Sequence, residues 1–307
     1  MRILVTGGAG FIGSHTADAL VAAQSHDIAV IDDLSSGRHE QLDKSVRFYH
    51  ADIRNSDEVN MIVGRECPEV LVHLAAQMDV RKSVAQPAFD AEVNIGGLLN
   101  LMEAGRTRGL RRVVFASTGG AIYGEQESFP CNEDHPQHPV SPYGVAKLAS
   151  EAYLFFYRAQ YGIDYVAVRY SNVYGPRQDP HGEAGVVAIF CGHMCAGKPC
   201  TIYGDGEQTR DYIYVGDVAR ANVAAVNTRF CGALNIGTGV ETSVKQLFNL
   251  LAGVAETSVQ PVYAPPRPGE QSRSVISPAR AAEQLAWKPE VPLQEGLSRT
   301  FEFFKRA

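Results

Sequence analysis

A tyrosine and a lysine stand four residues apart in the segment Ser141-Pro142-Tyr143-Gly144-Val145-Ala146-Lys147. At the start of a helix this spacing puts both side chains on one face. A free phenol has a pKa near ~10, and a neighbouring ammonium favours the phenolate by opposite-charge attraction. The pair therefore indicates a general base. The same spacing also occurs in ordinary amphipathic helices, where the lysine only reaches along the surface.

A second candidate for proton transfer stands upstream, in Ser117-Thr118-Gly119-Gly120. We expect the hydroxyl of Thr118, or with less support that of Ser117, to donate to a substrate oxygen or to pass a proton to Tyr143. Without the other motifs, either residue would be an equally good cap for a turn.

A glycine-rich segment near the N-terminus follows an expected strand and opens an expected helix. Its glycines permit a tight turn and a close approach to a pyrophosphate, and the positive end of the helix attracts the phosphates. The candidate cofactor residues in this loop are Gly7, Gly10, Phe11, Ile12 and Gly13.

Asp32 ends the second expected strand, 19 residues after Gly13. A carboxylate there accepts hydrogen bonds from the ribose hydroxyls of a dinucleotide and repels a 2′-phosphate. Arg38 stands too far along the chain to hold such a phosphate. The loop and Asp32 together predict NAD as cofactor, in preference to NADP.

The elements that would position these residues alternate in type. Short β-branched runs alternate with longer amphipathic runs, which is typical of βαβ units around a parallel sheet. The expected strands are 2–6, 28–32, 46–51, 70–75, 113–117 and 165–170, and the expected helices are 11–24, 56–66, 90–108 and 143–161. The fold class is therefore α/β, a Rossmann-like doubly wound parallel sheet.

The alternation ends after residue 172. Shorter helices are expected near 184–196, 215–228, 242–253, 278–285 and 293–305. We expect a nucleotide-binding domain over 1–172 and a smaller, interleaved substrate-binding lobe over 173–307. Ile213–Val218 and Ala233–Ile236 have the composition of strands, so parts of 211–240 should return to the first domain.

Composition narrows the class of protein. The 307 residues are 45% hydrophobic, enough for roughly two folding units. There are 28 basic and 34 acidic residues, and the resulting net charge of −6 disfavours a nucleic-acid partner. No run approaches the roughly 18 apolar residues that would span a membrane. We expect a cytoplasmic protein with neither nucleic-acid nor membrane partners.

Three cysteines and a histidine cluster at Cys191, His193, Cys195 and Cys200. Their spacing is not that of the paired ligands in zinc sites. Cys191 and Cys195 lie four apart in an apolar run, so we expect small core side chains and no metal. The cysteine pattern also predicts no disulfide framework.

Taken together, these motifs resemble the extended short-chain dehydrogenase/reductases, and among them the UDP-glucose 4-epimerase family most closely, over essentially the whole chain. The resemblance implies that Thr118, Tyr143 and Lys147 are the catalytic set. It also implies tightly held NAD and a homodimer formed through a four-helix bundle. It adds a list of cofactor contacts at the ends of the third and fourth strands: Asp52, Ile53, Leu74, Ala75 and Ala76.

The same resemblance implies the residues that bind a sugar nucleotide. Asn172, Arg210 and Arg267 would contact the diphosphate, for which planar guanidinium groups are suited. Thr201 and Tyr203 would meet the uracil and Glu270 a ribose, and Ser274 stands where some epimerases carry a bulky tyrosine beside the sugar C2. This small residue predicts that N-acetylated sugars are also accepted.

The expected reaction is reversible inversion at C4 of a UDP-hexose through a transient 4-keto sugar. Related 4,6-dehydratases carry Asp-Glu after the threonine, whereas this chain has Gly119-Gly120, which supplies no acid or base for elimination. One alternative is another NAD-dependent sugar-nucleotide oxidoreductase: a reductase, dehydrogenase or decarboxylase. A non-catalytic NAD sensor is a weaker one, because a sensor needs no base.

Overall fold

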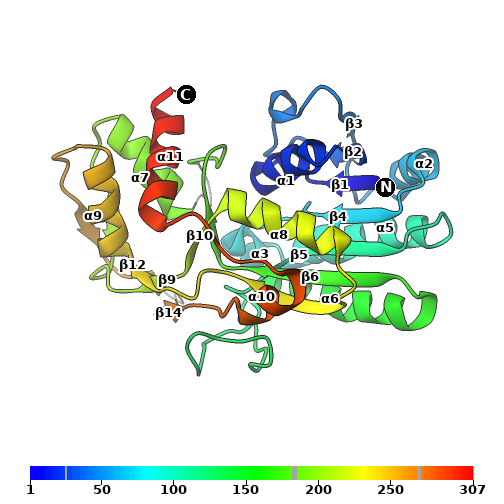
Figure 1. Cartoon of the computed structure of the whole chain (residues 1–307). Helices are drawn as coiled ribbons and strands as arrows, with labels where there is room; N and C mark the ends of the chain where they lie inside the picture. Colours follow the sequence, from blue (N-terminus) through cyan, green and yellow to red (C-terminus); the bar gives the residue numbers. More distant parts are fainter. Residues whose placement is uncertain (25, 182–184, 268–270, 307) are drawn as a thin grey trace.

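A parallel sheet of seven strands runs through the centre of the molecule (Figure 1). The computed structural model describes residues 1–24, 26–181, 185–267 and 271–306. The strand order is β11-β6-β5-β4-β1-β2-β3, and every pair of neighbours is parallel. The strands are β1 (Arg2–Thr6), β2 (Asp27–Asp32), β3 (Arg47–His50), β4 (Val70–His73), β5 (Arg112–Thr118), β6 (Asp164–Tyr170) and β11 (Gly232–Ile236).

The order of this sheet reverses between β1 and β4, because the chain builds outward from β1 in both directions. At such a switch point the loops on either side diverge, and a crevice opens at the carboxyl ends of the strands. The α/β doubly wound class is therefore confirmed.

Helices cover both faces of the sheet. On one face, α2 (Ser56–Glu66) packs on α5 (Gly97–Arg106), with α6 (Pro142–Tyr161) alongside. On the other, α1 (Phe11–Ala22) packs on α8 (Val215–Asn227). Both faces of the central strands are thus dry, which is why these strands are almost continuously apolar.

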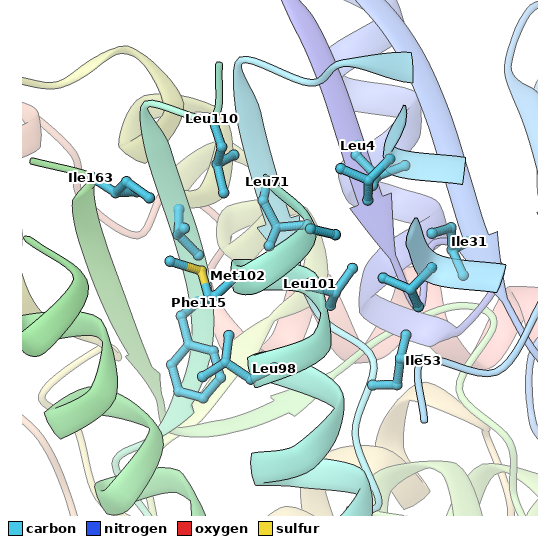
Figure 2. Close-up of a cluster of buried hydrophobic side chains, with 14 of the residues drawn as sticks. Leu4, Ile31, Ile53, Leu71, Leu98, Leu101, Met102, Leu110, Phe115 and Ile163 are labelled. Carbon is cyan, nitrogen blue, oxygen red and sulfur yellow. The ribbon is translucent and has the colours of Figure 1, made fainter. Parts of the chain in front are cut away.

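The larger of the two cores lies between the sheet and the pair α2 and α5. Figure 2 shows Leu98, Leu101 and Met102 of α5 facing Leu71 and Phe115 of the sheet. Each is at most 2% exposed, and burial of such a side chain stabilises the fold by about 1.5–3 kcal/mol. This core holds the strands whose ends carry the candidate site.

The connection from β4 to β5 departs from the single helix expected over 90–108. Pro87 starts an earlier helix, α4 (Pro87–Ala91), preceded by α3 (Val80–Ala85). Between α4 and α5 lies a π-helical turn, Glu92–Gly96. Single π turns within helices are rare and frequent at functional sites.

The second lobe contains small sheets and three longer helices with a core of their own. The helices are α7 (Val186–Cys195), α9 (Val244–Val254) and α11 (Leu293–Arg306), with the short α10 (Ala279–Leu285) below the main sheet. The small strands are β7 (Asn172–Tyr174), β8 (Thr201–Tyr203), β9 (Thr209–Arg210), β10 (Tyr212–Tyr214), β12 (Thr242–Ser243), β13 (Val262–Ala264) and β14 (Arg273–Ser274).

One expectation for this lobe is wrong. The segment 213–218 is not a strand of the first sheet, because only Tyr212–Tyr214 is extended and it pairs with β7. Val215 begins α8, whose buried face packs on α1. The strand Gly232–Ile236 does join the central sheet, beside β6. In the part of the chain that the structure describes, no helix has the length and apolarity to cross a membrane.

Candidate active site

The glycine turn between β1 and α1 is packed too tightly for side chains. Gly7 has φ +69°, and a Cβ on it would lie 2.6 Å from the backbone nitrogen of Ala75. A Cβ on Gly13 would lie 1.9 Å from the Gly7 carbonyl oxygen. The start of α1 is therefore drawn against β1 and the end of β4. Because Gly10 at the N-cap has no side chain, the first N–H groups of α1 are open to an anion.

Asp32 lies against this turn from the end of β2. Its Oδ2 accepts the Ala9 N–H at 2.9 Å, and its Oδ1 accepts the Leu34 N–H at 2.9 Å. The side chain is buried, and this burial raises the pKa of the carboxyl. Each carboxylate oxygen retains a lone pair for a further donor. The cradle and the carboxylate fit an adenosine ribose and a pyrophosphate, so these residues suit NAD.

The remaining predicted cofactor residues lie along the same edge of the sheet. Leu74 and Ala75 follow β4, and their N–H groups donate to the carbonyl and hydroxyl oxygens of Thr6. Asp52 follows β3 and pairs with Arg54 at 2.5 Å, which lowers the pKa of its carboxyl. The half-buried Phe11 and Ile12 stand at the start of α1, and the half-buried Ala76 follows β4. Ile53 is buried beside Asp52, against Gly97 of α5.

Tyr143 and Lys147 project from the first turns of α6 toward the end of β5. The Lys147 Nζ lies 4.8 Å from the centre of the Phe115 ring and 5.7 Å from that of Tyr143. Lys147 is 2% exposed, and this burial lowers its pKa to about 8. Lys147 is thus held in a dry environment, while Tyr143 is partly exposed.

Burial opposes the effect of the neighbouring ammonium on the phenol. Burial is the largest cause and raises the pKa of Tyr143, and the Asp90 carboxylate raises it further. Desolvation therefore outweighs the nearby ammonium. In the protein by itself the phenol holds its proton, and ionisation requires additional positive charge at the site.

The structure distinguishes the two candidate hydroxyls. Ser117 donates to Glu151 Oε1 at 2.5 Å, inside the protein. Thr118 is the last residue of β5, pairs in register with Tyr170 and is partly exposed. The arrangement favours Thr118 as the hydroxyl that faces a substrate.

A buried ion pair that the motifs did not indicate fixes α6 to the sheet. The Glu151 carboxylate accepts hydrogen bonds from Arg169 Nε at 3.0 Å and from Arg169 Nη2 at 2.6 Å. Arg169 Nη1 also donates to the Tyr123 hydroxyl at 3.0 Å. Glu151 stands one helical turn after Lys147, so the helix period could have identified it as part of the site.

A second polar cluster faces α6 from the β4–β5 connection. Asp90 and Asn94 are buried, and both bond to Gln77. Asn94 also accepts the Ser150 hydroxyl at its carbonyl oxygen, 3.2 Å away. No local motif marks these residues, because only the π turn and the packing of α4 on α6 bring them to the site.

The predicted sugar-nucleotide residues form two groups in the second lobe. Asn172 begins β7, and its N–H donates to the carbonyl of Asp211, the residue after Arg210. Ser274 pairs in register with Arg210. Asn172, Arg210 and Ser274 therefore lie together. Asn172 follows Tyr170, the residue that pairs with Thr118, by two positions along the chain.

The second group comprises Thr201, Tyr203 and Arg267. The first two belong to β8, and the Arg267 guanidinium carbon lies 4.0 Å from the centre of the Tyr203 ring. Stacking of a cation on an aromatic ring is favourable. Glu270 lies outside the described residues.

The cysteine–histidine cluster has the character of packing. Cys191 and Cys200 are buried in the core of the second lobe, and the His193 ring bonds to the Pro199 carbonyl. The expectation of a core side chain is wrong for Cys195, which is exposed near the end of α7. Across residues 1–24, 26–181, 185–267 and 271–306 there is no group of three or more potential metal ligands.

The chain is similar to known proteins along its whole length. The sequence profile described as "NAD dependent epimerase/dehydratase family" matches residues 3–237. A UDP-glucose 4-epimerase of Thermotoga maritima, solved with UDP-glucose, is 48% identical with a TM-score of 0.97, covering 100% of this chain and 99% of that one. A UDP-glucose 4-epimerase of Thermus thermophilus, solved with NAD, is 46% identical with a TM-score of 0.95 over the full length of both chains.

A third solved structure has a different substrate in its name. It is a UDP-N-acetylglucosamine 4-epimerase of Methanobrevibacter ruminantium in complex with UDP-N-acetylmuramic acid. It is 35% identical with a TM-score of 0.93, covering 99% of this chain and 97% of that one. The glycine cradle, the Asp32 carboxylate and the Tyr143–Lys147 pair thus stand on a scaffold shared with sugar-nucleotide epimerases along its whole length. The chain belongs to the NAD-dependent epimerase/dehydratase family.

Proposed function

We propose that this protein inverts the configuration at C4 of a UDP-hexose, reversibly and through a transient 4-keto sugar. The observation that carries the proposal is the Tyr143–Lys147 pair, whose buried ammonium lies 5.7 Å from the centre of the phenol ring, at the same carboxyl edge of the sheet as Thr118 and the glycine turn. Gly119 and Gly120 follow the threonine and carry no group that could eliminate water. A reaction confined to C4 fits this set.

NAD, when bound, supplies an acceptor for the C4 hydride and the positive charge that the phenol lacks. Tyr143 removes the proton of the C4 hydroxyl, and Thr118 holds that oxygen and its proton in line. Lys147 stabilises the phenolate, and Lys147 and Tyr143 would also contact the cofactor, Lys147 by holding the nicotinamide ribose. After the keto sugar has rotated and presents its other face, the same phenol returns its proton to the carbonyl oxygen.

Rotation of the keto sugar within the site requires strong contacts to UDP and weak contacts to the hexose. Arg210 and Arg267 would grip the diphosphate, and Asn172 would donate to it. Thr201 and Tyr203 would meet the uracil, and Glu270 a ribose. The lobe over 173–307 would thus anchor the nucleotide, while the domain over 1–172 carries the chemistry.

Ser274 would leave room at the C2 substituent of the sugar. It is a small side chain beside Arg210, and a relative at 35% identity is named for an N-acetylated substrate. We therefore propose that UDP-N-acetylglucosamine is also epimerised.

A homodimer is the proposed assembly, formed through a four-helix bundle that includes α6. This helix exposes aromatic side chains that a monomer would leave in water, Tyr153, Phe155, Phe156 and Tyr161 among them. Exposed apolar patches of this kind mark protein interfaces. The six free thiols fit the reducing conditions of a cytoplasm.

One experiment tests the function. Purified enzyme, without added NAD, is incubated separately with UDP-glucose and UDP-N-acetylglucosamine, and the products are separated by chromatography. We expect the C4 epimer of each, with no net accumulation of reduced cofactor. A product at another oxidation level, with reduced cofactor accumulating, would instead identify the alternative, a one-way oxidoreductase.

Tyr143→Phe separates the enzyme from a non-catalytic NAD sensor. We expect turnover to fall by at least about 100-fold, because the general base is lost. Bound NAD, released by denaturation and quantified, should remain within a few-fold of wild type. A wild-type protein that binds NAD but converts neither sugar would favour the sensor.

A further inference from the structure

Asp90 is a buried carboxylate with one oxygen left over. It lies on α4 at 1% exposure. Its Oδ1 accepts Gln77 Nε2 at 2.9 Å and Asn94 Nδ2 at 3.1 Å. Its Oδ2 is buried and has no hydrogen-bond partner. A buried anion in this state costs free energy unless a positive charge compensates it.

The elements packed on α4 differ in the charges they offer. The neighbouring helix α3 carries Arg81 and Lys82, both exposed, with the Lys82 Nζ 4.6 Å from the centre of the Phe89 ring. The π turn carries Glu92, whose side chain is 61% exposed. The N-terminal half of α6 carries Tyr143 and Lys147. Among these groups, Lys147 is the buried cation.

Two other titratable side chains lie near Lys147, but one is already in an ion pair and the other is uncharged. Glu151 is paired with Arg169, and both are buried. His73 is stacked on Phe115, and its burial lowers the pKa of the imidazole to about 3, so it carries no charge at neutral pH. Among the described groups around Lys147, Asp90 is thus a buried carboxylate outside any ion pair, and Lys147 is a buried ammonium outside any ion pair.

We propose that Asp90 is a positioning residue for the reaction: its carboxylate is the counter-charge that keeps the Lys147 ammonium protonated and directed at the Tyr143 site. The inference rests on the proposed function, since it assigns Asp90 a task in that reaction. Gln77 and Asn94 hold the carboxylate in place by binding Oδ1 and leave the buried Oδ2 without a hydrogen-bond partner.

The charge of Asp90 acts on both titrating groups of the site, Lys147 and Tyr143. The Asp90 charge raises the pKa of Lys147 and also that of Tyr143. Activity requires Tyr143 to lose its proton and Lys147 to keep its own. The acid limb of the kcat profile therefore reports Tyr143 and the alkaline limb Lys147. Removing the Asp90 charge should move both limbs to lower pH.

The test compares Asp90→Asn with Glu92→Gln. D90N keeps an oxygen for Gln77 and Asn94 and removes only the charge. E92Q removes a charge two residues away that is exposed, and serves as the control. We expect both limbs of the D90N profile to shift down by about one pH unit, because a nearby negative charge is removed, and those of E92Q to stay in place. A lower kcat with unshifted limbs would overturn the proposal.

A second measurement needs no turnover. In protein labelled at lysine, the NMR signal of Lys147 is assigned by its loss in Lys147→Met, and its titration midpoint is followed. In wild type we expect a midpoint near 8, and in D90N one lower by about one unit. An equal midpoint in both would overturn the proposal. Asp90→Ser, which removes the charge with a smaller side chain, decides the matter if D90N does not fold.

The two proposals fail in different ways. Wild-type enzyme that converts no UDP-hexose contradicts the proposed function, whatever the titration of Lys147. Wild-type enzyme that is an active epimerase, with a Lys147 midpoint insensitive to D90N, contradicts only the role of Asp90.

Discussion

The hydroxyl of Ser117 donates to the carboxylate of Glu151, Oγ to Oε1 at 2.5 Å, and is thereby committed to the interior. The next residue, Thr118, ends β5 and is partly exposed at the site. Two adjacent hydroxyls that are equivalent in the sequence therefore have different tasks: one is structural and the other is available to a substrate.

Thr118→Val and Ser117→Ala should separate these tasks. T118V removes the hydroxyl that would hold the C4 oxygen, so we expect kcat to fall about 10²-fold or more with little change in stability. S117A should keep kcat within a few-fold but lower the free energy of unfolding by about 1.5–3 kcal/mol, because a hydrogen bond to a buried charge is lost. The reverse pattern would mean that Ser117 is the catalytic hydroxyl.

The buried Lys147 ammonium should lower the free energy of unfolding, although the proposed reaction requires it. Burial lowers its pKa from 10.5 to about 8 despite the attraction of Asp90 and Glu151. The folded state thus disfavours the ammonium below pH 8, and this penalty fades as pH rises from 8 to 10.5, where the unfolded chain holds more protons. Lys147→Met should raise the free energy of unfolding at pH 7 by roughly 2–3 kcal/mol and abolish turnover.

Denaturant titration at two pH values checks this account of Lys147. The advantage of K147M over wild type should shrink between pH 7 and pH 10. A K147M protein that is less stable than wild type at pH 7 would show that the lysine is held by net attraction instead.

The Glu151–Arg169 pair should be a main fixture of α6. Glu151→Gln leaves the Arg169 guanidinium buried without its anion, and breaking a buried pair from one side costs about 3–5 kcal/mol. Glu295→Gln, which breaks an exposed pair with Arg299 on α11, is the control and should cost under about 0.5 kcal/mol. Similar losses in the two variants, by urea unfolding, would contradict this role.

The glycine turn should tolerate no side chain. Gly13→Ala places a Cβ 1.9 Å from the Gly7 carbonyl oxygen, so the start of α1 must move away from the cradle. We expect loss of co-purifying NAD together with lower stability. Gly253→Ala on α9, where a Cβ would meet nothing within 4 Å, should keep NAD and gain about 0.5–1 kcal/mol. NAD retained in G13A would show that the turn does not need its shape.

Local patterns were sufficient for much of the fold and for the core of the site. The alternation of apolar strands and amphipathic helices predicted the central sheet, because the apolar pattern of each segment indicates which of its faces is buried. The turn at Gly7 and the spacing of Tyr143 and Lys147 are likewise local, and the structure brings each of these features to the carboxyl ends of the strands.

The features that escaped prediction depend on tertiary packing. The extended run beginning at Ile213 looked like a strand of the first sheet, but α8 already starts at Val215 because its face packs on α1. Asp90 belongs to no motif and reaches the site only through the way α4 packs on α6. The effect of burial on Tyr143 also escaped prediction: burial raises the pKa of the phenol, against the attraction of Lys147, because burial is a property of the whole fold.

The central claim is that one hydrogen leaves C4 of the sugar and returns to the same carbon from the other side. UDP-glucose carrying deuterium at C4 tests it most directly, with the product isolated and its label located by NMR. We predict a C4-epimerised product that retains deuterium at C4 in ordinary water. Loss of the label to solvent would contradict the account, because it would mean that the hydrogen leaves as a proton.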